Sequence, residues 1–139
     1  MISLHPQTWQ QVRHQWGWIR SGLQAILERT ESRWVPEDVW TALRGAHAFL
    51  YTIRKNDDDV GFIVCRKIDD PDGCALFVWC LWTEADAMRD CYRDVIAELD
   101  KLAAAIGAGW IRMESPREAW NWGGMFTPTA MIFEREVTP

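Results

Sequence analysis

Three carboxylates in this sequence stand where proton-transfer chemistry is simplest to place. Glu84 and Asp86 directly follow a long apolar run, and Glu114 directly follows a shorter one. A carboxylate whose pKa is raised by burial can accept a proton from an amine, either directly or through a water molecule. These three residues are therefore our candidates for a general base. Glu84 and Asp86 also suit a simpler role as solvated acids at the start of a helix, and that interpretation is favoured for them.

Other residue types that often carry chemistry show no functional spacing. The acidic runs at 57–59 and 69–72 lack the ligand spacing of a calcium loop and are predicted to be hairpin turns. His5, His14 and His47 show neither metal-ligand spacing nor a Ser-His-Asp or Cys-His arrangement. The four cysteines lie in apolar runs or on a helical stripe, without a Cys-x-x-Cys pair, which predicts buried thiols in a reducing compartment. We therefore expect no metal centre.

The segment 73–109 is expected to position the first two carboxylates. Residues 74–82 are apolar throughout, which is typical of a sheet strand covered on both faces. From Thr83 onward the apolar residues recur at spacings of three and four, which predicts an amphipathic helix. A Thr-x-x-Asp box, Thr83 with Asp86, is predicted to cap the start of this helix, and Gly107 its end. A buried strand that leads into a capped helix is where an α/β protein holds an anion.

The remaining segments complete one α/β (α+β) domain over residues 1–139. Strands are predicted at 1–5, 48–54, 60–68, 110–114 and 127–137, and helices at 7–31, with a bend near Gly17 and Gly22, at 36–45, and briefly at 115–120. Turn-rich linkers separate the three strands between residues 48 and 82, so these strands should form consecutive antiparallel hairpins. The strand at 110–114 should run parallel to the strand at 74–82, because a strand-helix-strand unit normally forms a right-handed crossover.

The composition narrows the class of protein. A formal net charge of −5 disfavours a nucleic-acid partner, because proteins that bind phosphate backbones generally present a basic face. The apolar run at 74–82 is too short to cross a bilayer, and the N-terminal residues lack the pattern of a secretory signal. We therefore expect a soluble intracellular protein that binds protein partners, with no nucleic acid and no membrane span.

Ten tryptophans are unusual for a chain of this length. Tryptophan is enriched at binding surfaces, but it also fills cores, and full or partial burial is favoured for any single one of them. Trp16 and Trp18 should point to different faces of the first long helix, only one of which can face the core. An exposed apolar patch on a small protein usually marks a partner site or self-association. The candidates for partner binding are Trp16, Trp18, Trp120, Trp122 and Met125.

The order of strands and helices resembles that of the GCN5-related N-acetyltransferase (GNAT) fold. The segments that carry the resemblance are Met1-Ile-Ser-Leu-His-Pro6, Val60-Gly-Phe62 and Ala108-Gly-Trp-Ile111. The resemblance implies a mixed, mostly antiparallel sheet of about six to seven strands flanked by about four helices. Three further segments look like the small GNAT-like proteins of tailed bacteriophages, including the internal virion protein group of T7-like phages, and these are Trp34-Val-Pro-Glu-Asp-Val-Trp40, Ala48-Phe-Leu-Tyr51 and Ser115-Pro-Arg-Glu-Ala-Trp120.

The sequence departs from the GNAT pattern at two functional positions. GNAT enzymes bind the acetyl-CoA pyrophosphate in the turn after the fourth strand, with an Arg/Gln-x-x-Gly-x-Gly/Ala motif, whereas residues 81–89 here contain no glycine and carry two acids. These enzymes also often place a tyrosine, as general acid, in a short helix that corresponds to residues 120–126, where this chain has none. If acetyl-CoA binds, the resemblance assigns its contacts to the candidates Leu81, Trp82, Thr83, Arg89 and Asn121.

Together, the resemblance and the departures favour a non-catalytic GNAT-fold phage protein without a cofactor. Such a protein would act in virion structure or assembly through protein-protein contacts, in the host cytoplasm or in the virion. The alternative is an active acetyl-CoA-dependent N-acetyltransferase that acts on a small-molecule or protein amine, because backbone amides at a helix start can bind anions without a glycine motif.

Overall fold

The computed structural model describes residues 1–29, 33–71, 73–85, 87 and 91–113. In this part the chain forms nine elements: β1 (Ile2–Pro6), α1 (Trp9–His14), α2 (Trp16–Arg29), α3 (Pro36–Arg44), β2 (Phe49–Lys55), β3 (Asp58–Asp70), β4 (Gly73–Thr83), α4 (Tyr92–Ala105) and β5 (Trp110–Met113). The predicted helix at 115–120 and the predicted strand at 127–137 lie outside the described residues. The predicted α+β architecture is confirmed for the part described.

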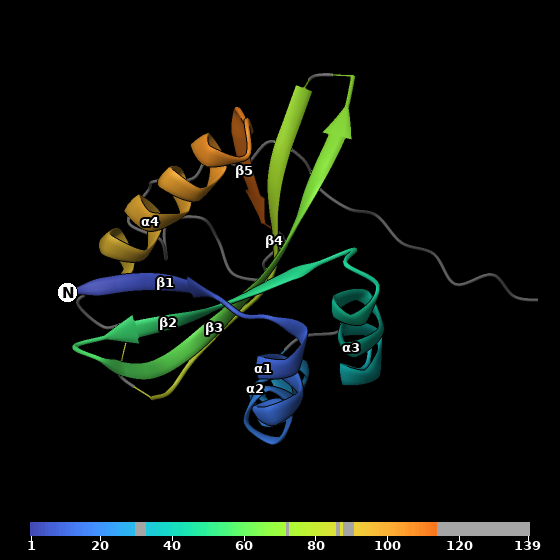
Figure 1. The fold of residues 1–139 in the computed structure, drawn as a ribbon, viewed down its shortest axis with the longest axis vertical. Helices are drawn as coiled ribbons and strands as arrows, with labels where there is room; N and C mark the ends of the chain where they lie inside the picture. Colours follow the sequence, from blue (N-terminus) through green and yellow to red (C-terminus); the bar gives the residue numbers. More distant parts are fainter. Residues whose placement is uncertain (30–32, 72, 86, 88–90, 114–139) are drawn as a thin grey trace, which may run out of the picture.

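The strands form one mixed sheet in the order β1-β2-β3-β4-β5 (Figure 1). β1 to β4 are antiparallel neighbours, and β5 runs parallel to β4, as the crossover rule predicted. The β2–β3 connection turns tightly because Asn56 and Asp57 adopt left-handed φ values of 51° and 71°. Of the first acidic run, Asp57 therefore lies in the hairpin turn as expected, whereas Asp58 and Asp59 begin β3 and pair with β2.

Helices cover both faces of this sheet (Figure 1). On the first face, which we call the α2 face, α1, α2 and α3 pack over side chains that include Leu50, Phe62, Val64 and Cys80. On the opposite face, the α4 face, α4 packs over side chains that include Ile53, Ile63, Leu76 and Val78. Because the β3 and β4 side chains alternate between two buried layers, both strands read as nearly continuous apolar runs in the sequence.

The predicted helix over 7–31 is two helices rather than one bent helix. Thr8 caps α1 through a reciprocal capping box with Gln11, and α1 ends at Gln15, whose φ of −99° and ψ of 6° leave the helical range. The side chain of Gln15 donates to Oε1 of Gln7 at 2.7 Å and thereby ties the break to the segment after β1. The break lies just before Gly17, close to where the glycines predicted a bend.

The predicted start of the helix after β4 is wrong. Thr83 is the last residue of β4 and pairs with Gly61, and the Glu84 N–H continues this ladder by donating to the Val60 carbonyl at 2.8 Å. Pairing with β3 therefore keeps the chain extended at Thr83 and Glu84, where the helix was expected to begin. α4 begins only at Tyr92, and its end agrees with the sequence, because Gly107 takes a left-handed φ of 77° two residues after Ala105.

In the described ranges, none of the helices is both long enough and apolar enough to cross a membrane.

Candidate functional site

β4 contains a β-bulge at Trp79. The β3–β4 register changes from Val64 opposite Cys80 to Cys65 opposite Val78, which leaves Trp79 as the extra residue. Trp79 and Cys80 consequently both contact the core of the α2 face, although successive strand residues normally point to opposite faces. The bulge therefore reverses the side-chain alternation of β4 halfway along its length.

β5 accompanies β4 only as far as this bulge. The last paired residues are Val78 of β4 and Met113 of β5. Within the described ranges, nothing pairs with β4 on the β5 side from Trp79 to Thr83. The second half of β4 thus has a hydrogen-bonding edge that β5 does not cover.

The alternation of the β3–β4 ladder identifies which backbone groups face this edge. Glu84 donates its N–H to the Val60 carbonyl. Because hydrogen-bonded pairs recur at every second position of an antiparallel ladder, Trp82 and Cys80 also form their backbone hydrogen bonds with β3. Leu81 and Thr83 fall between those positions and direct their N–H and C=O groups toward the β5 side. An unpaired strand edge of this kind can hold an extended ligand through main-chain hydrogen bonds.

The side chains of the predicted cofactor residues on β4 are occupied in packing. Trp82 lies with its ring centroid 5.6 Å from that of Trp18 and 5.5 Å from that of Phe62 on the α2 face. Leu81 packs against the core of the α4 face, and Thr83 is half-buried opposite Gly61. These residues can therefore serve a ligand through their backbone groups rather than through their side chains.

The first turn of α4 differs from the one that the sequence predicted. Its N-cap is Cys91, and its first turn contains Arg93 and Asp94. Arg93 is exposed, and its Nε donates to the Tyr92 hydroxyl at 3.5 Å. Glu84 is exposed in the connection after β4 and is not part of this turn. The acid that was expected to oppose a phosphate at the helix start therefore does not belong to the helix.

Glu84 also lies away from the bulge. Four strand positions separate it from Cys80, which corresponds to roughly 13 Å along an extended chain. A general base must approach its proton to within hydrogen-bond distance, directly or through one water molecule. Glu84 thus lies near the end of the open edge, too far along the strand to accept a proton from a group held at the bulge.

Arg66 is the charged residue nearest to the bulge among those described. It pairs with Phe77 in the β3–β4 ladder, and its Cζ lies 5.4 Å from the centroid of the Phe77 ring and 4.9 Å from that of Trp79. Trp34 packs edge-on against Trp79 at 5.9 Å. The Nε atom of Arg66 is buried and has no hydrogen-bond partner.

The buried thiols are unsuited to nucleophilic chemistry. Burial raises the pKa of Cys65 to about 12. Burial also raises the pKa of Cys80 to about 12, although nearby Arg66 acts in the opposite direction. Both side chains therefore remain protonated at neutral pH. The prediction of buried thiols is confirmed for these two cysteines, whereas Cys74 and Cys91 are only half-buried. Among the described residues, no group of His, Cys, Asp and Glu side chains is arranged to hold a metal ion.

Trp16 and Trp18 both contact the protein's own core. Trp18 packs on Phe62 at 5.8 Å, and Trp16 packs edge-on against Trp40 at 4.8 Å. Both are half-buried, so the prediction that only one of them faces the core is wrong. The reason is that α3 supplies Trp40 as a second wall, which covers a side of the helix that the sheet alone would leave open.

Seven further candidates lie outside the described residues. They are Asp86, Arg89, Glu114, Trp120, Asn121, Trp122 and Met125. Their roles stay predictions.

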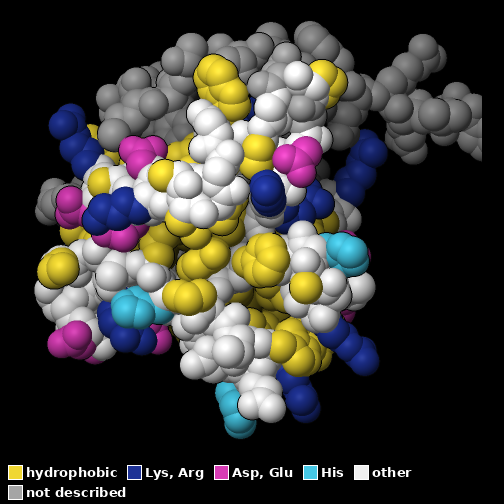
Figure 2. Space-filling model, turned by 45° about the horizontal axis from the view of Figure 1, so that its top comes forward, with side chains coloured by type: hydrophobic (Ala, Val, Ile, Leu, Met, Phe, Trp, Pro, Cys, Tyr) yellow, Lys and Arg dark blue, Asp and Glu magenta, His cyan; other side chains and the backbone are white. Residues whose placement is uncertain are grey.

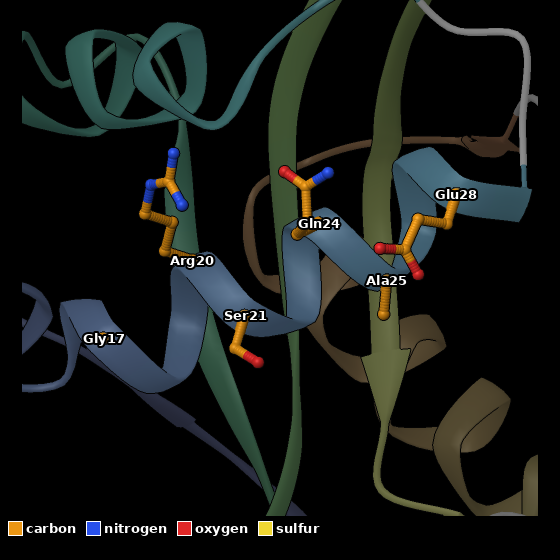
Figure 3. Close-up of a pocket in the computed structure, with 6 residues that line it drawn as sticks. All are labelled: Gly17, Arg20, Ser21, Gln24, Ala25 and Glu28. Carbon is orange, nitrogen blue, oxygen red and sulfur yellow. The ribbon is translucent and has the colours of Figure 1, made fainter.

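A shallow pocket of about 430 Å³ lies along the outer side of α2. Figure 3 shows Arg20 and Gln24 on one side of this helix and Ser21 and Ala25 on the other. Arg20 reaches α3 and forms an exposed ion pair with Glu37 at 3.3 Å. The described lining of the pocket comes from α2 alone and includes no residue of β4. The pocket is thus separate from the bulge, where the backbone geometry is unusual.

Sequence reasoning missed both Trp79 and Arg66. A one-residue bulge leaves a continuous apolar run unchanged, so the letters of β4 give no sign of it. Arg66 did carry a signal, because it directly follows the apolar run 60–65 within a predicted strand. A cation in such a strand needs a partner, and that need could have marked the residue.

Comparison with known proteins gives a match in structure alone. No protein-family model and no curated protein sequence matches the chain. A ribosomal-protein-alanine N-acetyltransferase from Brucella melitensis biovar Abortus 2308 is 14% identical with a TM-score of 0.66, and the alignment covers 100% of this chain and 99% of that one. An aminoglycoside acetyltransferase from an uncultured soil metagenomic sample is 13% identical with a TM-score of 0.68, over 99% of both chains.

A third solved structure is a predicted acetyltransferase with acetyl-CoA from Clostridium acetobutylicum. It is 14% identical with a TM-score of 0.68, and the alignment covers 98% of this chain and 96% of that one. At this level of identity the match shows the fold alone. The chain therefore has the GNAT-like α+β fold of these acetyltransferases.

Proposed function

We propose that this protein is an acetyl-CoA-dependent N-acetyltransferase. The observation that carries the proposal is the combination of a bulge at Trp79 with an uncovered edge at Leu81 and Thr83 on the same strand. A bulge next to an open edge is typical of functional sites, because it re-aims backbone groups and ends strand pairing. The three neighbours named above are acetyltransferases, and one of them is described with acetyl-CoA.

The open edge suits the extended, amide-containing arm of acetyl-CoA. The N–H and C=O groups of Leu81 and Thr83 would hold such an arm in the way that a strand edge holds a peptide. When bound, acetyl-CoA supplies an acetyl group on a thioester. The chain's own contribution at this edge is to orient the ligand along β4 toward the bulge and to exclude water through the flanking side chains of Trp82 and Leu81.

The start of α4 is compatible with a phosphate. The argument against acetyl-CoA placed two acids in the first turn of this helix, and that turn instead carries Arg93 beside Asp94. Helix N-termini attract anions through free N–H groups and the helix dipole, and glycine is not required for this attraction. The presence of Arg93 in this turn is the observation that favours the catalytic alternative over the non-catalytic one.

Calorimetric titration with acetyl-CoA tests the proposal, with CoA as competitor. We expect binding in about the micromolar range, and Arg93→Glu should weaken it by about two- to five-fold, because it reverses a charge at the helix start. Lys101→Glu is the matched control, since it makes the same charge reversal on an exposed residue near the other end of α4. Absence of any heat of binding for the unmodified chain would rule the proposal out.

A second candidate function is assembly through an apolar surface without catalysis, as a virion component. The observation in its favour is exposed apolar area, since Trp110 and Phe49 remain 59% and 52% exposed. Figure 2 shows hydrophobic side chains gathered in the middle of one face, with charged side chains of both signs around them. Such a surface is typical of partner binding or self-association. Light scattering on Trp110→Ser tests this role, because loss of a defined oligomer would support it and a monomer in both forms would exclude self-assembly.

A further inference from the structure

Arg66 lies on the α2 face of the sheet. Phe62 and Val64 of the same strand point into the core of this face, and the alternation of side chains along a strand places Arg66 on the same side. Its ladder partner Phe77 and the bulge residue Trp79 flank it on β4. A guanidinium group therefore lies within an otherwise apolar and aromatic part of the sheet.

The aromatic neighbours lie close to this guanidinium group but do not provide a hydrogen-bond acceptor for its Nε–H. Ring faces attract a cation, and Cζ of Arg66 lies 4.9 Å from the Trp79 centroid and 5.4 Å from the Phe77 centroid. The Nε atom is nevertheless buried without a hydrogen-bond partner. The ion pairs in the described part of the chain join Arg20 with Glu37, Arg54 with Asp59 and Lys101 with Glu98, so no described carboxylate neutralises Arg66.

A buried donor without a partner calls for an acceptor, and the described residues do not provide one. The N–H groups of a guanidinium lie in one plane, and its Nε–Nη edge matches the two oxygens of a carboxylate. The unsatisfied Nε–H of Arg66 belongs to this edge. A planar ligand with two oxygens satisfies Nε and one Nη together.

The place of Arg66 on β3, relative to the bulge in β4, indicates which ligand would carry such a carboxylate. Its partner Phe77 lies two residues before the bulge, or roughly 7 Å along the strand. Leu81 and Thr83 lie beyond the bulge in the opposite direction. A phosphate at the start of α4 would be at that far end, so Arg66 lies on the opposite side of the bulge from the proposed acetyl-CoA arm.

We propose that Arg66 binds the carboxylate of the acceptor, and that the acceptor is therefore an amine with a carboxylate several bonds away, such as an ω-amino acid or a short peptide. This inference rests on the proposed acetyl transfer only in one respect: it takes the ligand at Arg66 to be the acceptor of the acetyl group. The carboxylate site itself depends only on Arg66, Phe77 and Trp79. Two experiments separate these parts.

The first experiment follows the Arg66 Nε–H signal by ¹⁵N NMR in the absence of acetyl-CoA. The signal is assigned by its loss in Arg66→Lys. Titration with glutarate should move this signal downfield in a saturable way, whereas the neutral isostere glutaramide should leave it in place. An unchanged signal with glutarate, or equal shifts with both compounds, overturns the carboxylate site whether or not the protein is an enzyme.

The second experiment measures acetyl transfer to γ-aminobutyrate and to its uncharged analogue γ-aminobutyramide. The unmodified chain should prefer the carboxylate by at least about ten-fold in kcat/KM, because a charge-assisted hydrogen bond is lost with the amide. Arg66→Gln should abolish this preference, and Arg66→Lys should retain part of it. Lys67→Gln, one residue further and exposed, is the matched control and should keep the full ratio.

The outcomes are distinguishable. A glutarate-dependent Arg66 signal in a chain that acetylates neither amine contradicts the proposed function and the role as acceptor site, and leaves a carboxylate site without catalysis. Acetyl transfer without preference between the two amines, or a preference that persists in Arg66→Gln, overturns the inference while the proposed function stands.

Discussion

Gly22 determines how closely α2 approaches the sheet. A Cβ at this position would lie 2.6 Å from the Phe62 ring and 2.7 Å from the Trp82 ring. Both rings lie on the α2 face of the sheet. Gly17 of the same helix has nothing within 4 Å of the corresponding point. The two glycines therefore have different reasons to be there, although the sequence suggested that both weaken the helix.

The variant Gly22→Ala should lower the free energy of unfolding by about 1–3 kcal/mol, because overpacking against two aromatic rings exceeds the gain in helix propensity. Gly17→Ala should instead raise it by about 0.5 kcal/mol. Urea unfolding followed by tryptophan fluorescence measures both. Equal effects of the two substitutions would contradict the close approach of α2 to Trp82.

The buried thiols predict how stability depends on alkaline pH. The folded pKa of Cys65 and of Cys80 is raised from 9.0 to about 12, so the folded state holds protons that the unfolded state has lost in this range. Their stabilising contribution is complete below pH 9 and is lost as the pH rises toward about 12. The free energy of unfolding should therefore fall between pH 9 and about 12 by more in the unmodified chain than in Cys65→Ala/Cys80→Ala. The same pH dependence in both proteins would show that these thiols do not titrate as described.

At the scale of elements, the pattern of the sequence identified most of the structure but misplaced one boundary. Apolar alternation and turn residues located β2, β3 and β4, and the Pro36 and Gly45 signals bracketed α3. The Thr-x-x-Asp box failed because Thr83 still pairs with β3, and long-range pairing outweighs a local capping preference. The bulge at Trp79 was not predictable, since register depends on the partner strand rather than on the residues of β4 alone.

The uncovered edge of β4 predicts a pattern of amide exchange. In the free protein the Leu81 and Thr83 amides should exchange faster than those of Cys80 and Trp82, which donate to β3. Acetyl-CoA should slow exchange at the Leu81 and Thr83 amides in particular, because it would accept hydrogen bonds from them or keep water away from them. Residue-resolved hydrogen exchange by NMR provides the comparison. Slow exchange at Leu81 and Thr83 in the free protein would mean that this edge is already paired.

At the scale of the molecule, the sequence was enough to predict the fold. It was not enough to choose between a catalytic and a non-catalytic role. The order of strands and helices resembled the GNAT fold, and the solved structures with TM-scores of 0.66 to 0.68 agree with it. The preference for a non-catalytic role rested on the glycine-free junction after β4, on the absence of a tyrosine in residues 120–126 and on the phage-like resemblance. The later start of α4, at Tyr92, moves Glu84 out of the helix start and changes which residues lie at this junction.

The central claim is that the chain transfers an acetyl group from acetyl-CoA to an amine. The most direct test incubates the purified protein with acetyl-CoA and a panel of amines, including γ-aminobutyrate, and detects the N-acetylated product by mass spectrometry together with the released CoA thiol. We expect product that depends on both the protein and the amine. Release of CoA no faster than in the absence of protein, with no acetylated amine in the panel, would contradict the account.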